Sequence, residues 1–260
     1  MKLLESRGLL TLALAGAFLW SLTGVDWGSP LIHTGGGAAA RTFFLALFPP
    51  DLSPDFLGVA LAATWPTLAY AVAGMTVAVL IGIPLGILAS GTVVSSPALR
   101  LPAALVSRFS LGGLRAIHEL VWAVLFVAAF GLSPLAAVLA LGLPYGGILG
   151  RIYAELLHDV PPEPLRALRT AGASPMRQFL YGRVPLALPD MISYTFYRFE
   201  CAIRSAAIMS FVGIQGLGYQ IQLSLHDLLF RQVWTLLLFM LLLVVLVDQW
   251  SSLVRRKLAA

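Results

Sequence analysis

The sequence predicts an all-α integral membrane protein that crosses the bilayer several times. Charged residues make up 11% of the chain and apolar residues 59%, whereas roughly 25% of the residues of a soluble domain are charged. Several apolar runs reach the length of about 20 residues that a helix needs to cross a bilayer. The densest group of charges lies between Val160 and Arg204, where an arginine-rich amphipathic segment leads into an apolar one.

The composition also excludes other classes of protein. The net charge of +5 comes mostly from arginine, but nucleic-acid binding needs a basic patch on a water-soluble face, so we expect no nucleic-acid partner. Cys201 is the only cysteine, which excludes a disulfide framework or a cysteine zinc site within one chain. We expect no metal site and no catalytic residue.

Residues 1–56 are expected to form an N-terminal transmembrane helix and a segment at the outer membrane interface. Residues 8–25 form a short apolar run after Lys2 and Arg7. Such a run is also typical of a cleavable signal peptide, but we expect it to be retained as the first transmembrane helix. Glycines and prolines then interrupt the chain, and between them Ala38–Phe48 is apolar enough to form a short interfacial helix.

The predicted core begins with a long apolar run at residues 57–90. Pro66 and Pro84 lie within it, and a helix of that length exceeds the thickness of the bilayer, so we expect it to tilt or kink. Gly82 and Gly86 are four residues apart and would allow a neighbouring helix to approach closely.

The middle of the chain predicts two further spans joined by a tight turn. Residues 91–116 contain three arginines and no continuous apolar run, so we place them on the arginine-rich side of the membrane, partly as a helix. Glu119–Phe130 and Leu135–Leu157 are apolar, and a Gly-Leu-Ser-Pro turn separates them. Small residues typical of close helix packing follow the second segment, namely Gly142, Gly146, Gly147 and Gly150.

Six spans are predicted in total, near residues 8–25, 57–90, 117–131, 134–158, 186–212 and 232–254. With the N-terminus inside, nearly all lysines and arginines lie on the cytoplasmic side, as the positive-inside rule requires. We therefore expect both termini in the cytoplasm. The core comprises residues 57–260 and includes a cytoplasmic loop at 160–185.

Charged residues inside the predicted spans are candidates for function or for pairing. A charge at the bilayer centre costs about 2.5–3.5 kcal/mol on insertion scales, so Arg198, Glu200 and Arg204 are not expected to face lipid. Glu200 and Arg204 are four residues apart on one helix, a spacing at which they would neutralise each other. Arg115 and Glu119 repeat this spacing, and we interpret them as a structural anchor.

The cytoplasmic loop predicts a short helix over Pro164–Tyr181. Prolines bracket this segment on both sides and set its ends. Gly172 in its middle weakens the helix but permits close approach of another backbone. The residues alone leave two possibilities, a surface that docks to a partner protein and a solvated connector.

This loop carries a family resemblance. Its motif, R-A-L-x-x-x-G at residues 166–172 followed by Val184-Pro185, resembles the E-A-A-x-x-x-G…L-P loop of ABC importer permeases. Arg166 stands in place of the family's glutamate and Leu168 in place of its second alanine. The segments at 115–122, 149–155, 193–200 and 203–208 resemble the phosphonate-type branch, and the resemblance extends from about residue 57 to the C-terminus.

The resemblance implies a six-helix type I ABC importer permease, with both termini in the cytoplasm and a cytoplasmic coupling helix. Such a chain is the membrane subunit of an ATP-driven importer in the bacterial cytoplasmic (inner) membrane. The implied cargo is phosphonate, phosphite or a related phosphorus oxyanion, and hypophosphite and phosphate esters stay open. The implied partners are a second copy of the chain, as a homodimer, two cytoplasmic ATPase subunits, an extracytoplasmic substrate-binding protein and the lipid bilayer.

Three groups of site residues are expected, of which the resemblance implies the first and the residues themselves suggest the other two. A helix at 163–175 would lie in a groove of the ATPase, with an interface of Glu163, Arg166, Ala167, Arg169, Thr170, Gly172, Ala173 and Ser174. The expected translocation path comprises Tyr197, Arg198, Glu200, Arg204 and Ser205, in which Arg204 of each protomer would attract a dianion. An outer gate that changes shape when the binding protein docks is expected at Gly213, Gly216 and Gly218, although an ordinary flexible turn explains these glycines equally well.

We do not expect this chain to be an enzyme. It has only two lysines and no G-x-x-x-x-G-K-[ST] motif, so we expect it to bind no cofactor and expect ATP and Mg on the partner ATPase. The alternative is an ion-coupled secondary transporter of small anions, but such folds often have paired halves with broken helices, which the sequence does not show. An intramembrane enzyme would need a convergent catalytic set, which the sequence does not supply.

Overall fold

A computed structural model describes residues 2–28, 35–93 and 96–259 of the 260-residue chain. Every regular element in these ranges is a helix, as the composition predicts. The chain divides into two compact units, Met1–Ala46 and Leu47–Ala260.

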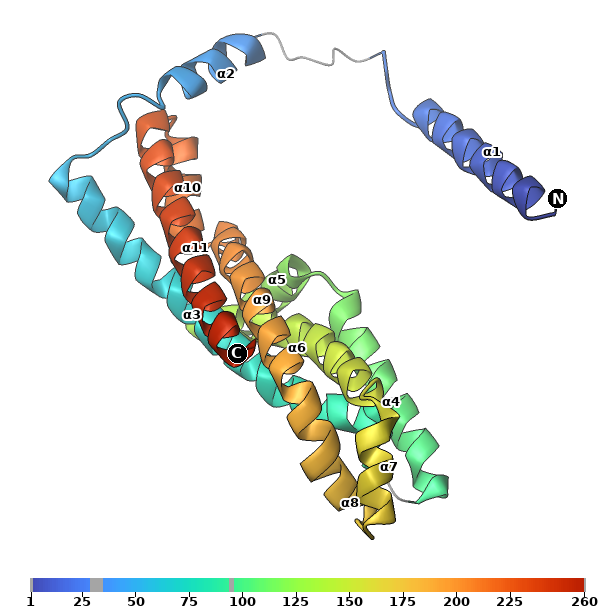
Figure 1. The fold of residues 1–260 in the computed structure, drawn as a ribbon. Helices are drawn as coiled ribbons and strands as arrows, with labels where there is room; N and C mark the ends of the chain where they lie inside the picture. Colours follow the sequence, from blue (N-terminus) through green and yellow to red (C-terminus); the bar gives the residue numbers. More distant parts are fainter. Residues whose placement is uncertain (1, 29–34, 94–95, 260) are drawn as a thin grey trace. The chain divides into compact units, whose positions relative to one another are not determined.

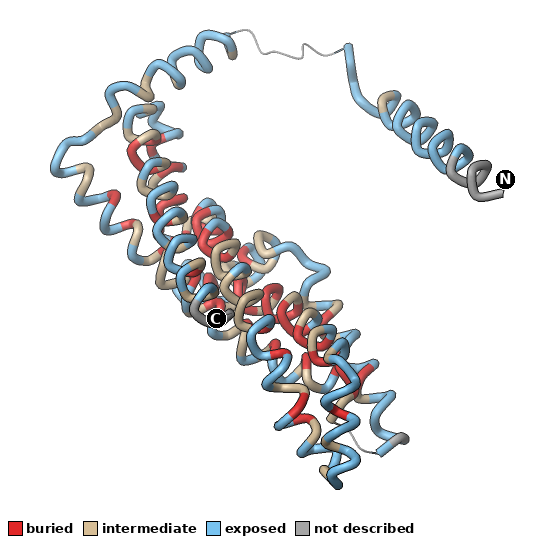
Figure 2. Tube along the Cα trace, in the orientation of Figure 1, coloured by how far each residue is buried: buried red, intermediate tan, exposed pale blue. Residues whose placement is uncertain are grey.

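The first unit contains α1 (Lys2–Thr23) and α2 (Gly36–Leu45), drawn in blue in Figure 1. Helices are therefore present where residues 8–25 and 38–48 predict them, while residues 29–34 of the expected interfacial segment lie outside the described residues. The side chains of α1 from Gly8 onward are nearly all exposed (Figure 2). An apolar helix with such exposure needs lipid or protein around it.

The second unit is built around α3 (Pro54–Ser90) and α6 (Pro134–His158), which lie against each other. Glycines allow this contact. A Cβ atom on Gly86 would lie 2.7 Å from the carbonyl oxygen of Gly150, and one on Gly82 would lie 3.1 Å from the amide nitrogen of Gly150. The predicted close approach at Gly82 and Gly86 is thus confirmed, and α3 continues through Pro66 and Pro84 as one helix of 37 residues.

The third predicted span needs correction. Residues 98–130 form two helices, α4 (Pro97–Ala116) and α5 (Glu119–Phe130), which meet at an angle of 85°. With 12 residues, α5 is about 18 Å long, well short of the roughly 30 Å hydrocarbon core. Residues 117–131 therefore do not form a span by themselves, and α4 is a complete helix where the sequence predicts a partly helical cytoplasmic segment.

The predicted cytoplasmic helix is also interrupted. The segment contains α7 (Pro162–Thr170), the short α8 (Pro175–Gln178) and a π-helical turn, η1 (Phe179–Arg183), which continues into α9 (Val184–Met209). Gly172 lies between α7 and α8 with a φ of 81°, rather than in the middle of a helix. Only glycine adopts this left-handed conformation readily, which explains why α7 ends here.

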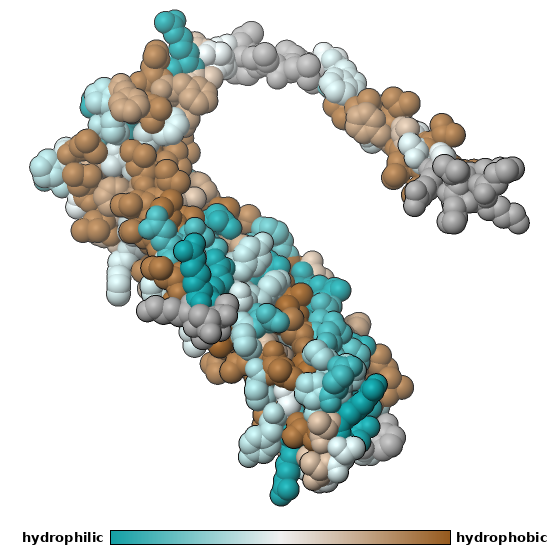
Figure 3. Space-filling model, in the orientation of Figure 1, coloured by the Kyte–Doolittle hydropathy of each residue, from teal (hydrophilic) through white to brown (hydrophobic). Residues whose placement is uncertain are grey.

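After α9 the chain forms a 3₁₀ turn, η2 (Ser210–Val212), then α10 (Leu217–His226) and α11 (Phe230–Ala259). The predicted last span is confirmed as part of α11, while α10 was not predicted. In unit 2, α7 and α8 lie at one end and α10 at the other (Figure 1). On the face shown in Figure 3, hydrophilic side chains gather over the half that carries α7 and α8, and the opposite half is mostly hydrophobic.

Three helices in the described residues are long and apolar enough to cross a membrane, namely α3, α6 and α11. The number rises to five if α4 with α5, and the helices from Pro175 to Val212 with α10, each count as one span. The apolar part of α1, Gly8–Thr23, is shorter. Six spans with both termini inside therefore stay a prediction.

Candidate functional site

The helix α7 is amphipathic and packs through one side only. Leu165 is buried, whereas Arg166 and Arg169 are exposed. Gly182 in the π-helical turn makes room for this side, because a Cβ atom there would lie 2.7 Å from Leu165 and 2.9 Å from Leu168. The arginines of α7 are therefore left free of the bundle.

The carbonyl groups of Leu168 and Arg169, near the C-terminal end of α7, are capped by backbone amides of the following turn. The amide of Gly172 donates to the carbonyl oxygen of Arg169 at 3.0 Å, and that of Ala173 donates to Leu168 at 2.9 Å. These two bonds define a Schellman motif. Ser174 then caps α8 by accepting from the amide of Arg177 at 3.4 Å, so the turn between the two helices is ordered by local bonds.

Arg183 connects this region to α6. Its Nη1 atom donates to the carbonyl oxygen of Leu157 at 2.7 Å and to that of His158 at 3.3 Å. The last carbonyl groups of a helix lack intrahelical donors and carry partial negative charge, so a guanidinium is a favourable partner for them. Arg183 thereby joins the C-terminal end of α6 to the N-terminal end of α9.

The structure brings the predicted coupling residues together on α7 and the turn after it. Seven of the eight are exposed, and Ala173 is half-buried. Exposed members are Glu163, Arg166, Ala167, Arg169, Thr170, Gly172 and Ser174.

The expected Glu200–Arg204 pair is wrong. Glu200 instead accepts a hydrogen bond of 2.6 Å from Ser251 and forms an ion pair of 3.1 Å with Arg255. Both partners come from α11, which packs against α9. Arg204 is exposed, and its Nη2 atom lies 3.3 Å from the Sγ atom of Cys201.

The other predicted path residues lie in separate groups. Arg198 donates to the hydroxyl of Tyr194 at 2.8 Å, and its guanidinium carbon lies 5.2 Å from the ring centre of Tyr194 and 5.6 Å from that of Tyr197. Ser205 is buried and faces α5 and α6 instead. The five residues therefore do not converge on one point within a single chain.

A buried polar chain that the sequence did not predict joins three helices. The Ser205 hydroxyl donates to Glu119 Oε1 at 2.8 Å and lies 3.0 Å from the Tyr145 hydroxyl. Glu119 begins α5, so its expected i,i+4 pairing with Arg115 is wrong, because that rule requires one continuous helix and the chain bends between them. The Nδ1 atom of His118 accepts from the amide of Leu120 at 3.2 Å and caps α5 at this bend.

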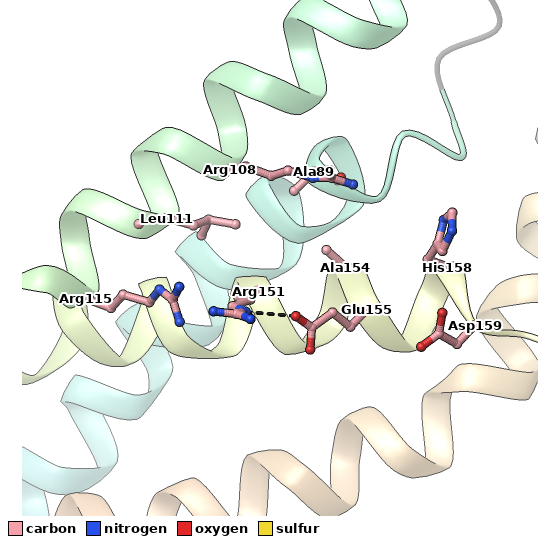
Figure 4. A pocket seen from close by; sticks show the side chains of 10 residues that line it. Ala89, Arg108, Leu111, Arg115, Arg151, Ala154, Glu155, His158 and Asp159 are labelled. Atoms are coloured by element: carbon pink, nitrogen blue, oxygen red, sulfur yellow. Dashed lines mark hydrogen bonds and ion pairs between the residues drawn. The ribbon is translucent and has the colours of Figure 1, made fainter. Parts of the chain in front are cut away.

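The freed Arg115 lies in a cavity of about 390 Å³ between α4, α6 and the end of α3. Figure 4 shows Arg115 and Arg151 among the side chains that line this cavity, with the Nε atom of Arg151 donating to Glu155 Oε1 at 2.8 Å. Arg108 reaches from the same helix as Arg115 and donates to the carbonyl oxygen of Ala89 at 3.0 Å. His158 and Asp159 line the far end of the cavity.

The glycine loop after α9 is tightly packed. Gly213 has a φ of 97°, which ends η2. A Cβ atom on Gly216 would lie 2.5 Å from the Ser210 hydroxyl and 2.9 Å from that of Thr67, and one on Gly218 would collide with the carbonyl oxygen of Ala207. The amide of Leu217 donates to the Thr67 hydroxyl at 2.9 Å, so this loop is attached to α3.

Within the described residues, no group of three or more His, Cys, Asp or Glu side chains has the arrangement of a metal site.

Comparison with known proteins relates this geometry to a family. Residues 82–260 match the family model of the binding-protein-dependent transport system inner membrane component. The chain is 33% identical to a phosphite transport system permease protein of Stutzerimonas stutzeri over 210 residues, which cover 79% of this chain and 74% of that protein. It is 31% identical to a phosphate-import permease protein of Mycolicibacterium smegmatis over 216 residues, which cover 83% of this chain and 40% of that protein.

A solved structure shows the same arrangement of helices. A chain of the methionine ABC transporter MetNI, in an inward-facing conformation, superposes with a TM-score of 0.69 and 20% sequence identity. The superposition covers 80% of this chain and 99% of that chain. At this identity the similarity concerns the fold.

Proposed function

Because this chain belongs to the family of binding-protein-dependent transport system inner membrane components, we propose that it is the permease subunit of an ATP-driven importer of phosphite, phosphonate or a related phosphorus oxyanion. It is a transport subunit of the inner membrane rather than an enzyme. The observation that supports a phosphorus oxyanion as the transported substrate is the 33% identity with a phosphite transport permease over 79% of this chain.

The proposed complex contains two copies of this chain, two cytoplasmic ATPase subunits and an extracytoplasmic substrate-binding protein. ATP and Mg are held by the ATPase subunits, and the permease spans the membrane six times with both termini in the cytoplasm. The family name, which refers to a binding protein, supports this composition. The exposed arginines on α7 support a protein contact at that end of the bundle.

We assign the ATPase contact to α7 and the turn after it. A helix that transmits movement from the ATPase must be connected to the transmembrane bundle. Two features connect α7 to the bundle. Leu165 and Leu168 pack against Gly182, and the neighbouring Arg183 holds the end of α6. A displacement of α7 is thus passed to α6 and α9 together.

Arg166 stands where the resemblance places a glutamate, so the charge at the first motif position is reversed. Arg166 and Arg169 are both exposed, and the ATPase groove that receives them is expected to present carboxylates. Such pairing would favour the correct ATPase subunit over others through charge complementarity.

The translocation path is assigned to the free face of α9 around Arg204. Because Arg255 neutralises Glu200, the exposed Arg204 keeps its charge available to an anion. A guanidinium presents a fork of donors that suits phosphorus oxyanions, while binding must remain weak enough for release. Arg204 of each protomer is proposed to line the path between the two copies.

Uptake by the reconstituted complex tests this function. The permease, its ATPase and its binding protein are incorporated into liposomes, and entry of phosphite is measured with ATP inside. We expect uptake that requires ATP and the binding protein. Uptake that does not require ATP but does require a proton or sodium gradient would instead indicate a secondary transporter.

Cross-linking tests the α7 assignment separately. Cys201 is the only cysteine, so a Cys201→Ser background permits single cysteines at Arg166 and, as a control, at Arg41 in α2. A cross-link between position 166 and the ATPase, with none from position 41, supports the assignment. Absence of a cross-link from every exposed position of α7 contradicts it.

A further inference from the structure

The arginine cavity, defined by Arg108, Arg115, Arg151 and Glu155, has no role in the function described so far. Arg108 and Arg115 are seven residues apart on α4 and therefore lie on the same face of that helix. Arg151 and Glu155 are four residues apart on α6 and share a face in the same way. Two helices thus present facing stripes of charge to one cavity of about 390 Å³, within the range of about 300–1,000 Å³ of small-molecule sites.

The backbones that carry these arginines are held in direct contact. A Cβ atom on Gly147 of α6 would lie 2.8 Å from the carbonyl oxygen of Leu111 and 3.0 Å from the amide nitrogen of Arg115. Gly150 packs against Leu111 in the same manner, since a Cβ atom there would lie 2.5 Å from its side chain. The Cα positions of Arg115 and Arg151 are therefore set by helix packing rather than by flexible loops.

The charges in the cavity do not balance. Three arginines face two carboxylates, Glu155 and Asp159, which leaves an excess of one positive charge among these five side chains. Arg108 donates to Ala89 and Arg151 is paired with Glu155. The Arg115 side chain has no hydrogen bond or ion pair within the described residues, and it lines the same cavity as Arg151 (Figure 4).

Arg115 and Arg151 are both exposed and line the same cavity, so an anion that enters it can reach both guanidinium groups. Arg151 has only one partner carboxylate, and Arg115 has five N–H donors to offer. We propose that this cavity binds a tetrahedral phosphorus oxyanion, with Arg115 and Arg151 as its donors and Glu155 as a carboxylate that competes for Arg151. The ion is either a free phosphorus oxyanion or the phosphate of an anionic lipid headgroup. The first source rests on the function proposed above and deepens it, whereas the second does not.

Competition by Glu155 makes the site weak, which suits a site that must release its ligand. Removal of Glu155 frees Arg151 and removes a negative charge from the cavity. Removal of Arg115 takes away the one guanidinium without a partner. The two substitutions therefore change the affinity for an oxyanion in opposite directions.

Binding to the purified full-length permease tests the proposal without the rest of the complex. Sodium phosphite and a short-chain phosphatidylglycerol are titrated separately by calorimetry in a neutral detergent, with phosphatidylcholine as the lipid control. The variants are Arg115→Gln, Arg115→Lys and Glu155→Gln. Arg256→Gln, an exposed arginine on α11 outside the cavity, is the matched charge control.

We expect Arg115→Gln to raise the dissociation constant by roughly tenfold or more, since it removes a charge-assisted hydrogen bond. Arg115→Lys should restore part of the affinity, Glu155→Gln should increase it, and Arg256→Gln should leave it unchanged. This pattern with phosphite assigns the site to the free ion, and the same pattern with phosphatidylglycerol alone assigns it to a lipid headgroup.

The proposal is overturned if neither probe binds saturably, or if Arg115→Gln binds as the wild type does while its thermal unfolding is unchanged. Uptake by the reconstituted complex separates this result from the proposed function. Phosphite uptake without binding at the cavity would remove this site and leave the function intact. Binding that follows the expected pattern, in a complex that does not import phosphite, would leave the site and remove the function.

Discussion

The side chain of Arg183, just before α9, donates a hydrogen bond of 2.7 Å to the carbonyl oxygen of Leu157 in the last turn of α6. This bond connects two helices that are far apart in the sequence, close to the point where α7 packs on Gly182. Arg183 therefore lies between α7, the helix proposed to contact the ATPase, and α9, the helix proposed to line the translocation path.

Replacement of Arg183 by Gln should uncouple ATP hydrolysis from phosphite transport. The carbonyl oxygens of Leu157 and His158 would lose their donor, which we expect to cost about 1–3 kcal/mol of stability. ATP hydrolysis by the reconstituted complex should continue while phosphite uptake per ATP falls. Arg177→Gln is the matched control, because the Arg177 side chain is exposed and belongs to α8. An equal ratio of phosphite uptake to ATP hydrolysis in the two variants would contradict this role of Arg183.

The contact between α3 and α6 should be intolerant of a single methyl group. In Gly150→Ala the new Cβ atom would lie 2.5 Å from Leu111 and 3.1 Å from the carbonyl oxygen of Gly82, so we expect a loss of about 1–3 kcal/mol from overpacking. In Gly113→Ala of α4 nothing lies within 4 Å, and alanine favours a helix by about 1 kcal/mol. Thermal unfolding of the two variants in detergent should therefore shift in opposite directions.

The sequence alone predicts those features of the fold that depend on residues close together in the chain. The apolar run at 57–90 predicts α3, and the four-residue spacing of Gly82 and Gly86 allows close approach of a neighbouring helix. The structure identifies that helix as α6. The resemblance to the family also rests on several short motifs taken together, of which the one at 166–172 is an example, and the family model confirms it. These inferences need no knowledge of what lies elsewhere in the chain.

Pairs between distant residues could not be predicted in this way. Glu119 pairs with Ser205, which is 86 positions away, and Glu200 pairs with Ser251 and Arg255. The i,i+4 rule offers each carboxylate an arginine on its own helix, but tertiary packing supplies a better-placed partner. For Glu119 the local rule failed because His118 caps α5 and separates Glu119 from the helix that carries Arg115.

The packing of the outer loop was also missed. Glycines at 213, 216 and 218 are compatible with flexibility, and only the position of Thr67 shows that the loop is held against α3. Whether this loop acts as a gate stays a prediction.

The ion pair between Glu200 and Arg255 should stabilise the contact between α9 and α11. Glu200→Gln leaves the Arg255 guanidinium without its carboxylate and should lower the free energy of unfolding. In a double-mutant cycle with Arg255→Gln, the coupling energy should be nonzero and favourable. The same cycle between Glu200 and Arg204 should give a coupling near zero, because Arg204 is exposed and points elsewhere. A large coupling with Arg204 would restore the pairing that the spacing predicts.

Arg204→Gln should separate transport from stability. Because the side chain is exposed, the substitution should change the free energy of unfolding by less than about 0.5 kcal/mol. Phosphite uptake should fall several-fold, with the affinity of the binding protein held constant, because the path loses its guanidinium. Arg204→Lys should recover only part of the rate, since an ammonium lacks the fork of donors. Uptake at the wild-type rate in Arg204→Gln would remove this residue from the path.

Lowering the pH should remove the stabilisation that Asp51 contributes just before α3. Hydrogen bonds from the Ser53 hydroxyl and from the Ser53 backbone amide hold the pKa of the Asp51 carboxyl below its usual value, with smaller contributions from Gln232 and Arg231. A carboxyl whose pKa is lower in the folded state stabilises that state above its unfolded pKa, and this contribution is lost as the pH falls through the folded value. The stability difference between the wild type and Asp51→Asn should therefore be constant at neutral pH and shrink below about pH 4. Thermal unfolding in detergent across this range tests it, with Asp55→Asn, which lies in the first turn of α3, as the control. A difference that grows on acidification would contradict the assigned direction of the shift.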